Sequence, residues 1–299
     1  MSAGFKEQRN HRCKWPAQPD VKLGYNTVMS KTKTKVWLAW FAMKLRPCLP
    51  RGVLDSSLQW LRRFVPDPDF EIFAELAEVD GLCLDIGANR GHSAISVLRQ
   101  TRRMRVLSVE PNKTYRWSLI LICLLHPWRF RFRLFAAGDE TAQQVLHVPG
   151  VRNSGLGTQA SLDVSEFGRS HICERLAEAG FDALDETAYR RLTVKVAPLD
   201  ALELSPDIVK IDVEGFEQQA LTGMGETLGR HLPALLIELN HPHRWMPFLK
   251  DLGYSFYFYD TSSRSLEVFR QTPGLVNLFC LHQANQSEIT RKLLQKVTT

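Results

Sequence analysis

The sequence lacks several patterns that are diagnostic of a protein class. Its six cysteines form no CxxC pair and have no histidine spacing that resembles a zinc site. The N-terminal stretch MSAGFKEQRNHRCK has neither the apolar core nor the small-residue cleavage site of a secretory signal. No apolar run reaches the ~20 residues that cross a bilayer, and no internal repeat or low-complexity segment is present. We therefore expect a cytoplasmic protein with reduced thiols and no metal site.

The N-terminal region, residues 1–66, differs in composition from the rest of the chain. It is basic and contains the apolar stretch VWLAWFAM, at 36–43, among several lysines. We predict a tail followed by two helices, at 35–45 and 54–64. The apolar stretch either packs on the domain or makes peripheral contact with a membrane. The net charge of +6 favours anionic surfaces without identifying one.

Residues 67–282 alternate short β-rich apolar runs with helical segments, and the chain's 44% hydrophobic content suffices for a large core. This pattern predicts an α/β domain with a mostly parallel sheet flanked by helices, followed by a short helix within 283–299. Seven core strands are expected at 82–87, 105–110, 131–137, 207–212, 234–239, 255–260 and 275–282. The last two have no clear crossover helix between them, so we expect an antiparallel pair at the sheet edge. The long connection 148–198, with a helix at 170–180 and a short strand at 192–197, is expected to be functional or to cover a site.

The turn after the first strand, in CLDIGANRGHSAISV, carries the first candidate binding residues. They are Asp85, Gly87, Ala88, Asn89 and Gly91. In open α/β sheets, ligands bind beyond the carboxyl ends of the strands. A dinucleotide favours GxGxxG, but here Asn89 stands in place of the middle glycine, and the Asp85 carboxylate would repel a diphosphate. That carboxylate would pair well with an ammonium group, so the turn favours S-adenosylmethionine over a nicotinamide cofactor.

The next two strand ends supply further candidates. Glu110 in SVEPN can accept hydrogen bonds from both hydroxyls of an adenosine ribose, a feature that nicotinamide enzymes share. Pro111 and Asn112 complete this turn and are included in the predicted cofactor site. Asp139, in AAGDE, either accepts a hydrogen bond from the adenine amino group or simply forms a turn.

The motifs DIGANRG, SVEPN, DIVKIDVEGFEQQALTG and PALLIELN, in this order, resemble the FkbM family of S-adenosylmethionine-dependent methyltransferases over roughly residues 70–282. The resemblance implies a class I, Rossmann-like fold with a seven-stranded sheet. It also implies methylation of a hydroxyl on a glycan, a lipid-linked molecule or a secondary metabolite. NSGLGTQASL resembles the loop before the fourth strand in that family, which makes Asn153 and Ser154 candidate substrate-binding residues. Two departures are the very apolar stretch at 115–128 and the N-terminal 65 or so residues, which have no counterpart in the family core.

Methyl transfer to an alcohol needs alignment in a dry pocket and benefits from a base that takes the hydroxyl proton. Lys210, Asp212 and Glu214 alternate along the fourth strand, so they point to one side while the chain stays extended. We predict Asp212 as the general base and Glu214 as an orienting group or second candidate. The alternative is an acidic cluster that caps the following helix and pairs with Lys210. Glu238 and His241, in IELNHPH, are predicted as polar groups on the substrate side rather than as magnesium ligands.

Two other functions compete with this hypothesis. A nucleic-acid methyltransferase acting on amino groups would carry an Asn/Asp-Pro-Pro-aromatic run after the fourth strand, where this sequence has DVEG. We therefore expect no nucleic-acid partner. A catalytically silent cofactor-binding or scaffold subunit is the second alternative, although the four acids Asp85, Glu110, Asp212 and Glu214 argue against lost activity.

Overall fold

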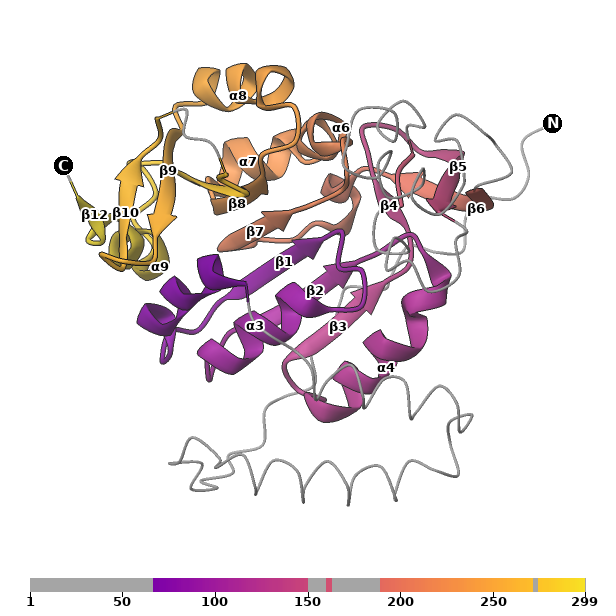
Figure 1. Cartoon of the computed structure of the whole chain (residues 1–299), viewed down its shortest axis with the longest axis horizontal. Helices are drawn as coiled ribbons and strands as arrows, with labels where there is room; N and C mark the ends of the chain where they lie inside the picture. The colour runs from indigo at the N-terminus through magenta and orange to yellow at the C-terminus, as the bar shows by residue number, and fades with distance from the viewer. Residues whose placement is uncertain (1–66, 150–159, 163–188, 271–273, 299) are drawn as a thin grey trace. The chain divides into compact units, whose positions relative to one another are not determined.

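The structure is a computed structural model that describes residues 67–149, 160–162, 189–270 and 274–298 (Figure 1). The chain divides into two units, Met1–Val65 and Pro66–Thr299, and all the described residues belong to the second. Several predictions therefore lie outside the described residues. They are the N-terminal tail with its helices at 35–45 and 54–64, the helix at 170–180, and the substrate-binding candidates Asn153 and Ser154.

A nine-stranded sheet, in the order β12-β10-β9-β11-β8-β7-β1-β2-β3, forms the centre of the second unit. Its parallel part comprises β1 (Leu82–Ile86), β2 (Arg105–Val109), β3 (Phe130–Arg133), β7 (Ile208–Ile211) and β8 (Ala234–Glu238). The strands β9 (Ser255–Asp260), β10 (Ser265–Val268), β11 (Asn277–Leu281) and β12 (Val297–Thr298) complete it. Every residue of β1 and β7 is buried, as expected for central parallel strands covered on both faces.

The predicted α/β class is confirmed, with seven predicted strands in the spatial order β3-β2-β1-β7-β8-β11-β9. The two late strands do pair antiparallel, since β11 lies between β8 and β9 and runs antiparallel to both. The short strands β10 and β12 extend the sheet at its edge beyond this set of seven. They escaped prediction because each is only a few residues long and is defined by its pairing partner.

The helices cover the sheet along its length (Figure 1). They are α3 (His92–Gln100), α4 (Arg116–Leu125), α6 (Glu217–Thr222), α7 (Gly225–His231), α8 (Pro242–Asp251) and α9 (Glu288–Leu294), with 3-10 helices at Pro68–Leu76, Lys113–Tyr115 and Leu199–Leu202. The apolar stretch at 115–128 is mostly α4, which buries Leu119, Leu121 and Ile122. The predicted C-terminal helix is α9, and Ser287 caps it by accepting the Thr290 N–H at 3.2 Å.

The predicted strand at 131–137 is wrong as a single element. Its first part is β3, and its end is the separate strand β4 (Ala136–Ala137) in a second sheet of order β4-β6-β5. The chain changes sheets because residues up to Arg133 pair with β2, whereas Ala136 pairs with Val196 of β6. The other two strands are β5 (Ala142–Pro149), which was not predicted, and β6 (Tyr189–Ala197), which contains the expected strand at 192–197.

The second sheet has a small core of its own, made by Ala136, Leu146, Val148, Val194 and Val196. Among the described helices, none combines the length and the apolar character that a bilayer span requires. Cys83, Cys123 and Cys280, the cysteines within the described part of the chain, are free thiols.

Candidate active site

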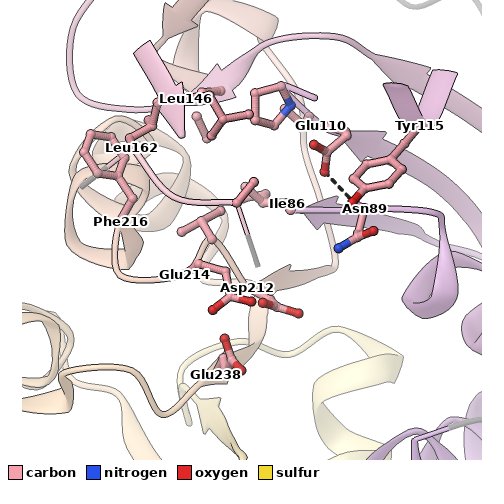
Figure 2. A pocket seen from close by; sticks show the side chains of 17 residues that line it. Ile86, Asn89, Glu110, Tyr115, Leu146, Leu162, Asp212, Glu214, Phe216 and Glu238 are labelled. Atoms are coloured by element: carbon pink, nitrogen blue, oxygen red, sulfur yellow. Dashed lines mark hydrogen bonds between the residues drawn. The ribbon is translucent and has the colours of Figure 1, made fainter. Parts of the chain in front are cut away.

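A pocket of about 270 Å³ opens at the carboxyl ends of β1, β2, β7 and β8 (Figure 2). One side is acidic and contains Asp212, Glu214 and Glu238. The opposite side is apolar and includes Leu146 of the second sheet and Leu162. A third side carries Asn89, Glu110 and Tyr115, and no lysine or arginine is among the described residues that line the pocket.

The turn after β1 can approach β7 only because residue 87 is glycine. Gly87 has φ +81°, and a Cβ built there would lie 1.6 Å from the backbone oxygen of Asp212. The N–H groups of Gly87 and Ala88 donate to the Val109 carbonyl at 3.0 and 3.2 Å, which ties the turn to β2 as well. The glycine turn therefore lies between the ends of β2 and β7, and it joins the two sides of the pocket.

Gly91 ends this turn and begins α3, again with a positive φ, of +91°. A Cβ at this position would lie 2.2 Å from Cδ1 of Ile122 on α4. Part of the apolar character of α4 is thus explained by its packing against the turn. Neither Gly91 nor Ala88 lines the pocket, although both belong to the predicted cofactor site.

Glu110 is a carboxylate of the pocket whose orientation the backbone fixes. Its side chain is held by two backbone N–H groups: Asn89 donates to Oε2 at 2.6 Å and Asn112 donates to Oε1 at 2.7 Å. Burial raises the pKa of Glu110 to about 7, although both of these hydrogen bonds lower it. Beside it, Pro111 lines the pocket, and Asn112 has a buried Nδ2 that finds no hydrogen-bond partner among the described residues.

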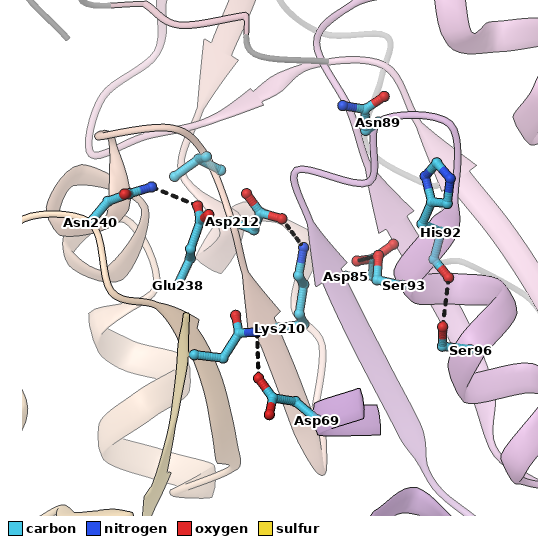
Figure 3. Close-up of polar contacts among 12 residues, drawn as sticks. Asp69, Asp85, Asn89, His92, Ser93, Ser96, Lys210, Asp212, Glu238 and Asn240 are labelled. Carbon is cyan, nitrogen blue, oxygen red and sulfur yellow. Dashed lines mark hydrogen bonds and ion pairs between the residues drawn. The ribbon is translucent and has the colours of Figure 1, made fainter. Parts of the chain in front are cut away.

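Asp85 lies beneath the turn and outside the lining of the pocket. It is 1% exposed, and its two oxygens accept the hydroxyls of Ser93 and Ser108, each at 2.6 Å. Burial raises the pKa of Asp85, while Lys210, its register partner on β7, opposes the shift. Figure 3 shows Asp85 and Lys210 on neighbouring strands. Direct contact between Asp85 and a cofactor ammonium stays a prediction.

Asp212 follows β7, and its side chain is 34% exposed. Lys210 Nζ contacts its Oδ2 at 2.5 Å, while the lysine side chain itself is only 7% exposed (Figure 3). Burial would raise the pKa of Asp212, but the Lys210 ammonium and a hydrogen bond with the Glu238 side chain hold it below its ordinary value. For Lys210, burial acts to lower the pKa, but Asp212 and Asp85 outweigh it and raise the value. The ion pair therefore persists across the neutral range.

Glu214 occupies a turn that its neighbours hold in a left-handed conformation. Its φ is +51°, and Glu217 at the start of α6 accepts the N–H of Gly215 at 3.1 Å. Ser161 Oγ donates to the Glu214 carbonyl at 2.9 Å, and Ser161 also pairs with His147 on β5. The short described piece 160–162 thus connects the second sheet to the acidic side of the pocket.

The carboxylate oxygens of Asp212, Glu214 and Glu238 come within 4.8 Å of one another, a spacing that would suit a divalent cation. However, a buried ammonium, that of Lys210, already contacts Asp212, and the Asn240 side-chain amide donates to Glu238. In the described residues, the Lys210 ammonium therefore already offsets part of the negative charge of these three acids. The expectation that no metal is used stays a prediction.

Two further predicted site residues, Asp139 and His241, lie outside the pocket lining. Asp139 is exposed in the turn between β4 and β5, so its side chain is outside the lining. His241 begins α8 in a left-handed conformation, and its ring contacts that of His243 rather than the pocket. In contrast, the structure brings Gly87, Asn89, Glu110 and the three acids Asp212, Glu214 and Glu238 together.

Sequence reasoning missed the apolar side of the pocket and the partners of Asp85. Leu146, Leu162 and Phe216 line the pocket from three separate segments, which no local pattern connects. The contact between Ser108 and Asp85 could have been predicted, because Ser108 on β2 is the register partner of Asp85 on β1. The contact with Ser93 was harder to predict, because its indication is only that Ser93 lies in the first turn of the helix that follows.

A mainly parallel sheet with a glycine turn after β1, an acid at the end of β2 and acids after β7 defines a class I methyltransferase fold. Residues 85–256, more than half of the chain, match the family model described as the methyltransferase FkbM domain. The chain belongs to this family of S-adenosylmethionine-dependent methyltransferases, which confirms the resemblance noted from its motifs. Among curated proteins, none matches the sequence.

Several solved structures are similar at low identity. A methyltransferase FkbM from Methylobacillus flagellatus KT has 16% identity and a TM-score of 0.41, and the match covers 83% of this chain and 60% of that one. A precorrin-6y C5,15-methyltransferase from Geobacter metallireducens GS-15 has 10% identity and a TM-score of 0.38, covering 75% and 92%. A Pyrococcus abyssi tRNA (uracil-54, C5)-methyltransferase, in complex with S-adenosyl-L-homocysteine, has 14% identity and a TM-score of 0.35, covering 71% and 36%.

Proposed function

We propose that this protein transfers a methyl group from S-adenosylmethionine to a hydroxyl oxygen, and that Asp212 takes the hydroxyl proton. The acceptor is a glycan, a lipid-linked molecule or a secondary metabolite. The observation that carries the proposal is the Asp212 side chain, one-third exposed in the pocket and ionised beside a buried lysine. A carboxylate in this state can accept a proton as a carbon–oxygen bond forms.

The residues on the β1–β2 side fit this cofactor better than a dinucleotide. Bound S-adenosylmethionine supplies an activated methyl group and carries positive charge on its sulfonium and its ammonium. Glu110 offers carboxylate lone pairs to ribose hydroxyls, and the buried Nδ2 of Asn112 is a donor without a described partner. The described lining has four acids and no basic side chain, which disfavours a diphosphate and favours a cation.

On the β7–β8 side, Asp212 and Glu214 orient the acceptor hydroxyl, while the apolar side of the pocket excludes water. Bound S-adenosylmethionine would supply the methyl group for the new bond to the acceptor oxygen and would leave as the neutral thioether, and Asp212 would take the hydroxyl proton. Asn153 and Ser154 stay proposed acceptor contacts, together with Glu238 and His241. The negative charge of this side also favours an acceptor without a phosphate near the reacting hydroxyl.

Isothermal titration calorimetry of the full chain with S-adenosylmethionine, S-adenosylhomocysteine and NAD tests the cofactor. We expect binding of the first two and none of NAD; preferential binding of NAD would overturn the proposal. A screen of hydroxylated glycans and lipids with radiolabelled methyl donor then tests the acceptor. Label transferred only to nitrogen or carbon would contradict O-methylation.

We further propose a cytoplasmic protein whose N-terminal region contacts membranes peripherally. The support is the sequence alone, in which VWLAWFAM at 36–43 lies among lysines. Sedimentation of the full chain with vesicles of neutral and of anionic lipid tests this contact. Equal recovery in the supernatant with and without vesicles would argue against it.

A further inference from the structure

Glu238, at the end of β8, lies close to a second carboxylate, that of Asp212, in the pocket. The Asn240 side-chain amide donates to Oε2 of Glu238 at 2.6 Å (Figure 3). Carboxylate oxygens of Glu238 and Asp212 also lie within 4.8 Å of each other. Two ionised carboxylates this close repel each other and can only accept hydrogen bonds, so one proton held by the pair removes the repulsion and supplies a donor.

The surroundings decide which of the two acids carries this proton. Lys210 Nζ contacts Oδ2 of Asp212 at 2.5 Å, so the buried positive charge stabilises the ionised form of Asp212. Glu238 has no such ion pair among the described residues, and its side-chain donor is the neutral amide of Asn240. The charge therefore belongs to Asp212 and the proton to Glu238.

The other groups that face Glu238 act in the same direction. Glu214, in the turn before α6, adds a second negative charge from the same side of the pocket. On β11, the register partner of Glu238 is Asn277, whose amide donates to Asp69 at 2.8 Å. Within the described part of the chain, the cation that acts on Glu238 is Lys210, and it lies against Asp212.

We propose that Glu238 is a neutral carboxylic acid in the resting protein and a positioning residue for Asp212, to which it donates its proton in a hydrogen bond. With Lys210 on one side and Glu238 on the other, the Asp212 carboxylate has a fixed orientation and keeps lone pairs for the acceptor hydroxyl. This assignment deepens the proposed function, because it rests on Asp212 as the base. It adds a second role for Glu238 to its proposed contact with the acceptor.

The proton count follows directly. At rest, the pair of Asp212 and Glu238 holds one proton and one negative charge. When the acceptor hydroxyl loses its proton to Asp212, the pair holds two protons and is neutral, and one proton must return to solvent before the next turnover. Burial, together with the charges of Asp212 and Glu214, raises the pKa of Glu238 well above its ordinary range, which agrees with a protonated acid at neutral pH.

Infrared difference spectroscopy of the ligand-free full chain tests the assignment without any acceptor. The spectra are recorded at about pH 9, where Glu110 and Glu217, each with a pKa of about 7, are ionised. We expect a protonated-carboxyl band that disappears in Glu238→Gln and persists in the matched control Glu214→Gln. A band that Glu238→Gln leaves unchanged, or no band at all, would overturn the proposal.

The pH dependence of the free energy of unfolding gives a second test, because a side chain with a purely structural role would not change this dependence. A protonated Glu238 binds its proton more tightly in the folded than in the unfolded chain, so wild-type stability falls as pH rises above about 4.5. Relative to Glu238→Gln, the wild-type unfolding constant should therefore increase by up to about tenfold per pH unit. Parallel pH profiles of the two proteins would contradict the assignment.

The glutamine variant is well suited to this comparison because its amide can still donate to Asp212. We expect Glu238→Gln to keep the fold, whereas Glu238→Ala removes the donor and lowers stability at every pH. Neither measurement uses the methyl donor. Absence of S-adenosylmethionine binding would thus count against the proposed function alone, and absence of the carboxyl band against this inference alone.

Discussion

The acids of the β1–β2 side and those of the β7–β8 side of the pocket are held in different ways. Asp85 and Glu110 have their oxygens occupied by serine hydroxyls and backbone N–H groups at 2.6–2.7 Å. Asp212 is held by the Lys210 ammonium and Glu238 by the Asn240 amide, and Asp212 is 34% exposed. Neutral donors at fixed positions favour binding of a ligand and a constant shape of the site. An ion pair beside a shared proton favours proton transfer.

The largest effect on stability should come from a substitution in the turn that joins the two sides of the pocket. Gly87→Ala places a methyl group 1.6 Å from the Asp212 carbonyl at a φ of +81°, so the turn must move away from β7. We expect a loss of about 4 kcal/mol or more in the free energy of unfolding, measured by urea denaturation. Gly229→Ala in α7, where a Cβ meets nothing within 4 Å, is the control and should be neutral or stabilising. Equal stability of both variants would refute the close approach.

Removing the base on the β7–β8 side should separate chemistry from binding. Asp212→Asn keeps the size of the side chain but cannot take a proton, so turnover with an acceptor from the screen should fall about 10²-fold to 10⁴-fold. The dissociation constant for S-adenosylmethionine, measured by calorimetry, should change little. An unchanged constant also shows that the variant is folded. Turnover equal to wild type would exclude Asp212 as the base.

Glu110→Gln makes the complementary change on the β1–β2 side. Loss of hydrogen bonds between a carboxylate and ribose hydroxyls should weaken S-adenosylmethionine binding about tenfold to 100-fold, with a smaller effect on turnover at saturation. Because the pKa of Glu110 is about 7, wild-type affinity should fall as pH decreases below 7 and level off above it. Affinity of the variant should not follow this pH profile; a shared profile would assign the titration to another group.

The smallest effect is expected at Asp139. The sequence allows this side chain to accept the adenine amino group, but it is exposed between β4 and β5 and outside the pocket lining. Asp139→Asn should therefore change S-adenosylmethionine affinity by less than about twofold, as is usual for surface substitutions. A tenfold loss in calorimetry would restore the adenine contact.

The sequence predicts the β1–β2 and β7–β8 strand ends well because both signals are local. Short apolar runs mark the parallel strands, and Glu110 and Asp212 come directly after two of them, so they meet at the carboxyl edge of the sheet. The position of Asp85 beneath the turn is harder to predict, since it depends on the hydroxyls of Ser93 and Ser108 from two other elements.

The second sheet could not be derived from local patterns. The strand β5 is exposed or half-buried over its first four residues, so its apolar signal begins only at Leu146. The division of 131–137 into β3 and β4 depends on β6, which lies more than fifty residues further along the chain. Pairing partners that are distant in sequence decide such strands.

The second sheet has one further consequence, for divergence within the family. Leu146 reaches the pocket from the second sheet, which has its own core, while Glu110 and Asp212 follow strands of the large sheet. Substitutions in β5 or β6 can therefore change the apolar side of the pocket while the hydrogen bonds of the large sheet stay the same. We expect differences in acceptor among related chains to concentrate in this sheet rather than at the acids of the large sheet.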